Sequence, residues 1–288
     1  MSEPWQRFYF SQRLRLSYWM WGDEKNNPLI LLHGGRDHSR TWDAIAQHFA
    51  SKFSVFAPDL RGHGDSDWAN GSYYATVDHV LDLSKFVDLL PTPPVIVGHS
   101  FGGSISLLTA SIFPNIFEKI VDIEGAGARL EDSKDGTGAN TPETLRNWAA
   151  SYQRIETQVV KKYGAFSDAV DRMMSGNKYL TREQATHLAR WGTVKEDDGF
   201  RWKFDPRARG RTPTELLAEE MPALWSEIAC PILHLSGERS GYTRTEFLGR
   251  PIDSYFKNST SAVVPDAGHH AHHDNLEFVI DQIEKFIQ

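Results

Sequence analysis

The sequence lacks the features that mark most secreted and membrane-spanning proteins. Its 288 residues include a single cysteine, Cys230, so no disulfide can form within the chain and nothing calls for an oxidising compartment. The N-terminal segment has no basic stretch followed by an apolar one, as a signal peptide would have. The longest aliphatic run, near Leu29–Leu32, is far shorter than the roughly 20 residues of a membrane helix. We therefore expect a cytoplasmic protein with no membrane partner.

Positive charge is also scarce. Lys and Arg number 31 against 38 Asp and Glu, which gives a net charge of −7. No run of five or six basic residues occurs, so nucleic acid is a poor partner. Hydrophobic residues make up 40% of the chain and charged residues 24%, which is typical of globular proteins and excludes a disordered or fibrous chain. We expect a small-molecule substrate as the partner, and the composition leaves open whether the chain forms a homo-oligomer.

Strand and helix patterns alternate along the first part of the chain. Two segments that alternate polar and bulky residues, Arg7–Ser11 and Leu14–Trp21, predict antiparallel strands. The unbroken aliphatic run Leu29–Leu32 is typical of a strand buried on both faces of a parallel sheet. Further strands are expected at Phe53–Ala57, Val95–Val97, Ile120–Ile123, Ile232–Leu235 and Ala262–Val264, and helices at Trp42–Ala50, Val77–Leu90, Gly103–Ile112, Thr243–Phe256 and Leu276–Ile287. This order predicts an α/β fold with a mostly parallel sheet flanked by helices.

The pattern changes after residue 126. The segment Ala128–Pro142 is rich in Gly, Asp and Ser and predicts a linker or mobile loop. Helical patterns follow at Pro142–Lys162, Ser167–Met174, Thr181–Trp191 and Pro213–Ile228, with a short extended piece at Phe200–Phe204. We therefore predict one α/β core domain, residues 1–126 and 228–288, with a helical cap inserted at residues 127–227.

One motif carries chemistry. The sequence Gly98-His99-Ser100-Phe101-Gly102 is a G-x-S-x-G pattern between a β-branched strand and a helix. A serine on so tight a turn lifts its Oγ clear of the sheet, and glycines two residues before and after it prevent side chains from colliding. The helix that follows points its N-terminal N–H groups toward developing negative charge. Ser100 is therefore the candidate nucleophile.

A second glycine-rich turn, His33-Gly34-Gly35, ends an earlier strand. Acyl transfer to a serine needs two N–H donors aimed at the oxyanion that forms. One donor comes from the residue after the nucleophile, here Phe101, and the other from a loop after an earlier strand. Gly35 is the best candidate for the second donor.

These motifs resemble those of the α/β-hydrolase fold family. The matching stretches are Leu32–Gly35, Asp59–Ser66, Gly98–Gly103 and Pro265–His269, and the likeness covers nearly all of the chain outside the insert. The resemblance implies an eight-stranded sheet, a helical cap after strand six and a Ser–acid–His triad in that chain order. Through Trp202–Pro206 the chain is also similar to the serine hydrolase-like branch of the family.

The resemblance assigns the general base to His269, which follows a short strand and a Pro-Asp-Ala-Gly turn. Its imidazole would take the proton of Ser100 and return it to the leaving group, for which a pKa of about 7 is suited. Three more histidines crowd this loop, His270, His272 and His273, and closely spaced histidines can bind a metal. Because no cysteine is nearby and the triad accounts for the first histidine, we predict no metal site and no cofactor.

The sequence leaves the acid of the triad open. The family commonly places it in a G-x-x-D turn after strand seven, but the corresponding turn here, Gly237–Ser240, ends in serine. Some members carry the acid after strand six, where this chain has Asp122 and Glu124. We assign the role to Asp122, with Glu124 and Glu238 as alternatives, because only geometry decides which carboxylate accepts the histidine Nδ1–H.

The leading hypothesis is a serine hydrolase of the esterase kind. It would cleave a carboxylic ester or lactone of a small apolar or aromatic substrate through an acyl-enzyme. The cap is rich in aromatic residues, and we expect Trp148 and Trp191 to line the substrate site. The same triad could instead hydrolyse a carbon–carbon bond of a diketone-like substrate. A ligand-binding receptor that retains the fold would show a broken nucleophile or histidine loop, and neither is broken here.

Overall fold

Eight strands form one mixed sheet in the computed structural model, which describes residues 3–70, 74–126, 142–157, 160–209, 216, 218–241 and 246–288. In sheet order the strands are β1 (Trp5–Ser11), β2 (Leu14–Trp21), β4 (Phe53–Pro58), β3 (Asn27–Leu32), β5 (Val95–His99), β6 (Lys119–Ile123), β9 (Ile232–Gly237) and β12 (Ser259–Val264). Strand β2 is antiparallel to both neighbours, and every pair from β4 to β12 is parallel. The predicted mostly parallel, eight-stranded α/β fold is confirmed.

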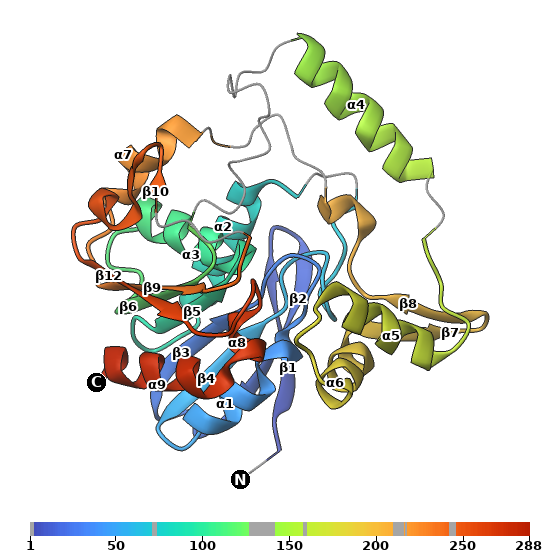
Figure 1. Cartoon of the computed structure of the whole chain (residues 1–288), viewed down its shortest axis with the longest axis horizontal. Coiled ribbons are helices and arrows are strands. Elements are labelled where there is room, and N and C mark those ends of the chain that lie inside the picture. Colours follow the sequence, from blue (N-terminus) through green and yellow to red (C-terminus); the bar gives the residue numbers. More distant parts are fainter. Residues whose placement is uncertain are drawn as a thin grey trace.

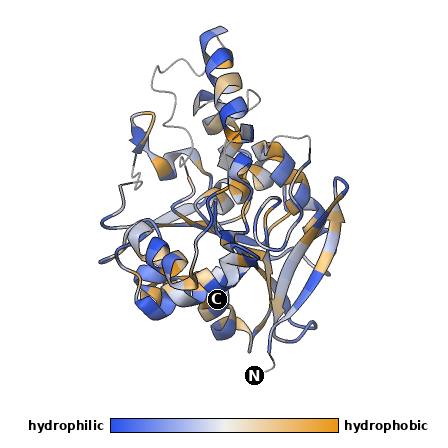
Figure 2. Cartoon of the chain, turned by 90° about the vertical axis from the view of Figure 1, so that its right-hand side faces the viewer, coloured by the Kyte–Doolittle hydropathy of each residue, from blue (hydrophilic) through white to orange (hydrophobic). Residues whose placement is uncertain are grey.

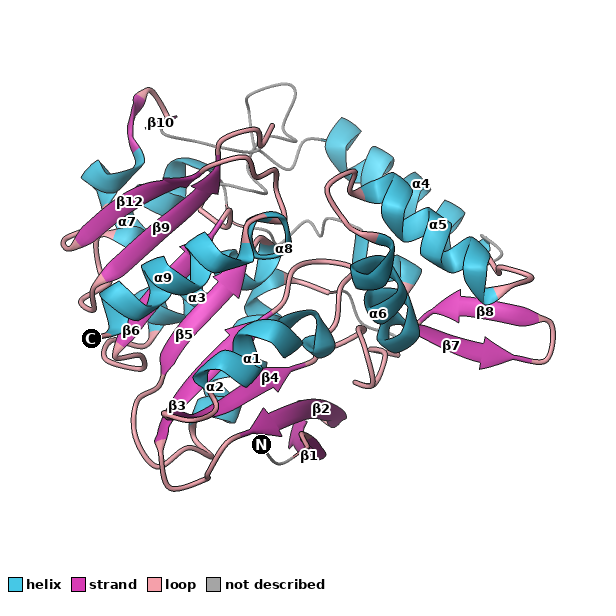
Figure 3. Ribbon diagram, turned by 60° about the horizontal axis from the view of Figure 1, so that its bottom comes forward, coloured by secondary structure: helices cyan, strands magenta, loops and turns pink. Residues whose placement is uncertain are grey.

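Helices cover both faces of this sheet (Figures 1 and 3). They are α1 (Asp43–Phe49) and α9 (Leu276–Ile287) on one face, and α2 (Thr76–Val87), α3 (Phe101–Ile112) and α7 (Met221–Trp225) on the other. Successive residues of a strand point to opposite faces, so Leu29 and Leu31 of β3 pack in the first layer while Ile30 and Leu32 pack in the second. This burial on both faces explains why the aliphatic run of β3 is unbroken.

Helices α2 and α9 are amphipathic, whereas α3 is buried along most of its length. Figure 2 shows hydrophobic (orange) and hydrophilic (blue) stretches alternating along the helices around the sheet, as expected for helices with one buried face. No helix in the part of the chain that the structure describes combines the length and the apolar character that crossing a bilayer requires.

The residues between β6 and β9 include a layer with its own core. Helices α5 (Phe166–Gly176) and α6 (Arg182–Gly192) and the hairpin β7 (Thr193–Glu196)–β8 (Gly199–Trp202) surround an apolar cluster that includes Val170, Leu180 and Leu188. Helix α4 (Pro142–Thr157) stands away from the other helices (Figure 1). Although α7 lies within the predicted insert 127–227, it packs with the sheet layer. Residues 128–141 of the loop predicted at Ala128–Pro142 lie outside the residues that the structure describes.

Two helices predicted from the sequence differ in the structure. In place of a helix over Thr243–Phe256, the described residues form the hairpin β10 (Glu246–Phe247)–β11 (Arg250–Pro251) and a short 3-10 turn. Leu248 and Gly249, between the two strands, both have positive φ, at 45° and 74°, which is the geometry of a two-residue hairpin turn. Of Pro213–Ile228, the described residues are helical only at η4 (Ala218–Glu220) and α7.

Asp205, from the Trp202–Pro206 motif, joins the layer of α5, α6 and β7–β8 to the layers around the sheet. Its carboxylate is almost completely buried, with the residue 1% exposed, and its Oδ2 accepts a hydrogen bond from the Tyr74 hydroxyl at 2.6 Å. The Asp205 N–H donates to the Gly62 carbonyl at 2.7 Å. The Tyr74 hydroxyl in turn accepts from the Ala69 N–H at 2.9 Å. The motif thus fixes the end of β8 against the loop that follows β4.

We expect the substitution Tyr74→Phe to lower the free energy of unfolding by about 1–3 kcal/mol, because it removes a donor from a buried carboxylate and an acceptor from a buried N–H. Urea denaturation measures this change. The matched control is Tyr9→Phe, whose hydroxyl makes a 3.4 Å contact with the Asp82 carbonyl and whose loss should cost less. Equal stability of Tyr74→Phe and the unsubstituted chain would contradict this account of the joint.

Candidate active site

Ser100 occupies a strained turn between β5 and α3. Its backbone angles, φ 51° and ψ −118°, are rare for residues other than glycine. A Cβ on Gly98 would lie 2.7 Å from the Gly102 carbonyl oxygen, and one on Gly102 would lie 2.4 Å from the Leu32 carbonyl oxygen. The Ser100 N–H donates to the Ile123 carbonyl at 2.8 Å, which holds the turn against β6. The two glycines therefore allow the backbone contacts that present the serine.

His269 lies beside Ser100, with its Nε2 at 2.9 Å from the serine Oγ. The loop that carries it follows β12 and is held at both sides. The Gly268 N–H donates to the Asp274 carboxylate at 2.8 Å, and the Ala267 carbonyl accepts from a backbone N–H of the loop after β9 at 2.8 Å. The structure thus brings together the two residues predicted as nucleophile and base.

The carboxylate that reaches His269 is that of Glu124. Its Oε2 is 3.3 Å from the His269 Nδ1, and its side chain is completely buried. Two further groups hold it: the Ser240 hydroxyl donates to Oε2 at 2.8 Å, and the Gly237 N–H donates to Oε1 at 2.6 Å. Glu124 has a positive φ of 59°, which interrupts the regular alternation of side chains at the end of β6. The carboxylate therefore lies against β9, facing the histidine loop.

Asp122, predicted as the acid, is placed elsewhere. Its Oδ2 accepts a hydrogen bond from the His234 Nδ1–H at 2.9 Å. Its Oδ1 lies between two backbone segments, since a Cβ on Gly103 or Gly125 would be 2.1 or 2.2 Å from that oxygen. The structure contradicts the position predicted for Asp122, because its carboxylate fills the space beside α3 and bonds to β9 instead of to His269.

The turn after β9 places no carboxylate against His269. Glu238, the other alternative, is exposed, and its Oε2 accepts from the Asp266 N–H at 3.0 Å. Ser240 ends the turn at the position where the family commonly has an aspartate, and its hydroxyl bonds to the Glu124 carboxylate. The turn lies beside the histidine loop but supplies a hydroxyl, while the residue directly after β6 supplies the carboxylate. Ser240 was therefore the feature of the sequence that favoured an acid at the end of β6.

The predicted oxyanion donors lie on two loops that meet at Ser100. Phe101 is the first residue of α3, so its N–H belongs to the helix turn that carries the positive end of the dipole. The loop after β3 passes close to the serine, since a Cβ on Gly34 would lie 3.2 Å from the Ser100 Cβ. Gly35 follows directly on this loop, and a Cβ there would meet no atom within 4 Å.

Trp191, predicted to line the substrate site, lies at the joint between cap and core. Its ring makes an edge contact with Trp19 at 5.3 Å between centroids, and the Arg40 guanidinium lies 3.8 Å from its ring centroid. Arg40 is buried and donates two 2.6 Å hydrogen bonds to Asp43. These contacts give Trp191 a packing role. Trp148, the other predicted residue, is half-buried on α4.

Buried histidines surround the candidate base. His99 is 2% exposed, and its Nε2 lies 2.8 Å from the His269 carbonyl oxygen. His272 is also 2% exposed and stacks on Trp42 with 4.6 Å between centroids. Burial lowers the pKa of His99 and of His272 well below its ordinary value, and it lowers the pKa of His38 to about 4. These imidazoles are therefore neutral at pH 7.

The buried histidines should make the stability depend on pH. In the unfolded chain a histidine has a pKa of about 6.5, so below that value the unfolded chain binds more protons than the folded one. The free energy of unfolding should therefore fall as the pH falls from 6.5 toward 4, by up to about 1.4 kcal/mol per pH unit for each such imidazole. The histidines concerned are His33, His38, His99, His270, His272 and His273.

Three carboxyl groups act in the opposite direction. Burial raises the pKa of Asp37 to about 7 and that of Asp59 to about 6, and it also raises the pKa of Asp274, so the folded chain binds extra protons there. The measured slope should thus be smaller than the six imidazoles alone would give. Urea denaturation between about pH 7 and pH 5 measures the slope. A stability that does not fall over this range would contradict the expectation.

Comparisons with known proteins bear on the family and the fold of this chain. A sequence model described as "Alpha/beta hydrolase family" matches residues 29–282. The "Serine hydrolase-like protein" of Danio rerio is 23% identical over 276 residues, which cover 93% of this chain and 84% of that protein. Among solved structures, "Thioesterase Domain From Curacin Biosynthetic Pathway" has a TM-score of 0.85 at 21% identity and covers 99% of this chain and 100% of its own. "Crystal Structure of E-2-(Acetamidomethylene)succinate Hydrolase" has a TM-score of 0.79 at 20% identity, with 99% of both chains covered.

Proposed function

This chain belongs to the alpha/beta hydrolase family, and from that premise we propose that it is a serine hydrolase that cleaves carboxylic esters through an acyl-enzyme. One observation carries the proposal: Ser100 Oγ lies 2.9 Å from His269 Nε2, and His269 Nδ1 lies 3.3 Å from Glu124 Oε2. A hydroxyl within reach of an imidazole whose other nitrogen faces a buried carboxylate is the arrangement that activates a serine. The relatives found support the broader statement that the chain is a hydrolase of this family.

In the proposed reaction the Ser100 Oγ attacks the ester carbonyl carbon while its proton passes to His269 Nε2. The Glu124 carboxylate accepts the Nδ1–H, which keeps the Nε2 lone pair free beforehand and stabilises the imidazolium afterwards. The N–H groups of Phe101 and Gly35 bind the oxyanion of the tetrahedral intermediate. His269 then protonates the leaving alcohol, the C–O bond breaks, and water releases the acid from Ser100 by the same steps.

The substrate we propose is an ester or lactone with a small apolar or aromatic group. The cap supplies an aromatic side chain next to the base: the Tyr179 ring lies so close to Gly268 that a Cβ there would be 3.0 Å from it. Asn177 holds this part of the cap by donating to the Asp274 carboxylate at 2.9 Å. A pocket lined by aromatic side chains favours apolar ligands, and we propose that Trp148 on α4 also lines this pocket.

A fluorophosphonate probe tests the proposed class, since it forms a covalent bond with an activated serine hydroxyl. We expect labelling of the unsubstituted chain and none of Ser100→Ala. Without the probe, the unsubstituted chain should also hydrolyse aryl and medium-chain esters faster than highly charged ones. An unlabelled chain would favour a binding protein that retains the fold, and a preference for charged esters would contradict the proposed substrate.

The acid is tested by a pair of substitutions. Glu124→Gln should lower kcat by roughly 10³–10⁴-fold, because an amide cannot hold the required histidine tautomer or stabilise the imidazolium. Asp122→Asn is the matched control and should keep most of the turnover, since Asp122 bonds to His234 and not to His269. Both variants are compared by p-nitrophenyl butyrate hydrolysis after circular dichroism has verified folding. Loss of turnover in Asp122→Asn alone would return the role to Asp122.

A further inference from the structure

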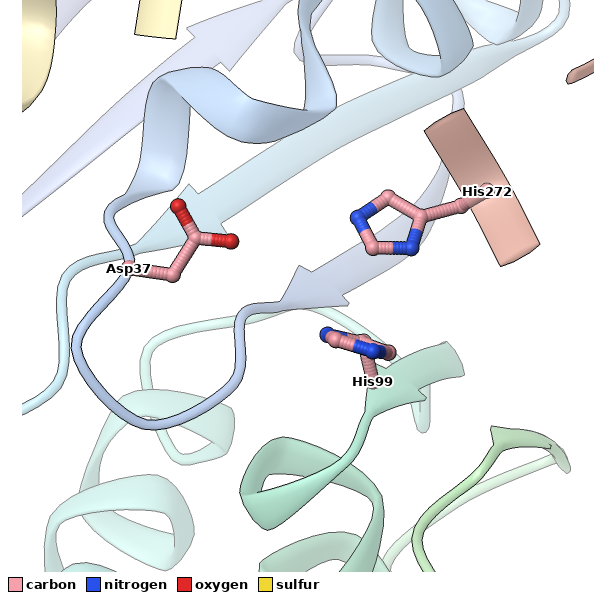
Figure 4. A group of neighbouring side chains, drawn as sticks. All are labelled: Asp37, His99 and His272. Carbon is pink, nitrogen blue, oxygen red and sulfur yellow. The ribbon is translucent and has the colours of Figure 1, made fainter. Parts of the chain in front are cut away.

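Three side chains from distant parts of the sequence converge beside the histidine loop. Asp37 lies on the loop after β3, His99 is the last residue of β5, and His272 lies on the short helix α8 (Ala271–Asp274). One potential ligand atom from each residue lies within 4.8 Å of those of the other two. Figure 4 shows the carboxylate and the two imidazole rings around one space.

Buried nitrogen atoms in this cluster have no hydrogen-bond partner among the described residues. They are Nδ1 of His99 and both ring nitrogens of His272, and each of these residues is 2% exposed. A buried polar atom without a partner destabilises the fold, so such atoms in a folded protein call for a partner such as an ion. His99 on β5 and His272 on the helix α8 therefore both bring unpartnered ring nitrogens to the same site.

The hydrogen bond of His99 orients it as a ligand. Its Nε2 lies 2.8 Å from the carbonyl oxygen of His269, and a carbonyl can only accept, so Nε2 carries the hydrogen. The lone pair therefore resides on Nδ1, the ring nitrogen for which the described residues supply no hydrogen-bond partner. Metal-binding histidines commonly donate their other ring N–H to a carbonyl in this way, which fixes both tautomer and ring orientation.

We propose that Asp37, His99 and His272 bind a divalent transition-metal ion such as Zn²⁺, Co²⁺ or Ni²⁺. Two imidazoles and one carboxylate are donors that these ions favour, with water at the remaining position. Tetrahedral Zn²⁺ needs donor atoms about 3.4 Å apart, and the three atoms lie within 4.8 Å of one another, so binding draws the widest pair together by at most about 1.4 Å. Asp37 can supply this movement because it is half-buried on an irregular loop, next to Arg36 with its φ of 65°.

The ion would connect the three segments that build the active site. Asp37 lies two residues after Gly35, His99 directly precedes Ser100, and His272 follows His269 by three positions. Binding should thus stabilise the folded chain by mass action, since the unfolded chain does not hold the three ligands together. This site is separate from the proposed hydrolysis, because it uses none of the groups that react with an ester.

Isothermal titration with Zn²⁺ tests the site, on the full chain without a histidine tag and after treatment with a chelator. We expect one ion per chain, a higher midpoint of thermal unfolding with Zn²⁺, and visible absorption from bound Co²⁺ typical of nitrogen and oxygen ligands. Asp37→Asn, at a half-buried position where the variant should fold, is expected to weaken Zn²⁺ binding at least about 10-fold. His272→Gln provides the second variant, with folding checked by circular dichroism.

Two controls separate this proposal from its alternatives. His48→Gln removes an exposed histidine that lies 3.1 Å from Glu284, and it should leave Zn²⁺ affinity unchanged. Ser100→Ala should bind Zn²⁺ as tightly as the unsubstituted chain, so a failure of the proposed hydrolase activity would not affect this result. The proposal is overturned if the unsubstituted chain binds no Zn²⁺, if neither Asp37→Asn nor His272→Gln weakens binding, or if His48→Gln abolishes it.

Discussion

The close approach of backbone segments around the β5–α3 turn is the constraint on which the candidate site depends. Gly98 and Gly102 let the turn lie directly against the end of β3 and the start of α3, at distances that any side chain would prevent. The Ser100 N–H also bonds to the Ile123 carbonyl, which fixes the end of β6 beside it. Glu124 is the residue that directly follows β6. The positions of the nucleophile and of the carboxylate thus follow from one packing arrangement.

Strained backbone conformations occur where strands end at this site. Arg36, Ser100, Glu124 and Asp266 all have positive φ, and they follow β3, β5, β6 and β12. Such conformations cost of order 1–3 kcal/mol each for residues other than glycine, and they persist only when surrounding contacts determine them. At Glu124 those contacts are identifiable, because the Gly237 N–H and the Ser240 hydroxyl both hold its carboxylate. Hydrogen bonds from β9 and from the turn after it therefore stabilise the strained conformation of Glu124.

Helix α6 contacts both loops that flank the nucleophile. From α6, His187 lies 3.1 Å from the Arg40 carbonyl oxygen, close to the loop after β3. Gln184, also on α6, donates to the His273 carbonyl at 3.2 Å, next to the loop of the base. Any displacement of α6 would therefore act on the oxyanion side and on the histidine side together. The packing of Trp191 belongs to the same joint.

The sequence by itself determined the features that depend on local physics. Unbroken aliphatic runs predicted the central strands, and glycine spacing placed Ser100 on its turn, because burial on two faces and steric exclusion are properties of neighbouring residues. Only the tertiary structure decided between Asp122 and Glu124, which lie two positions apart and would share one face of a regular strand. A positive φ at Glu124, stabilised by donors from β9, separates them. Contacts between strands distant in the sequence made that choice, and no spacing along the chain records them.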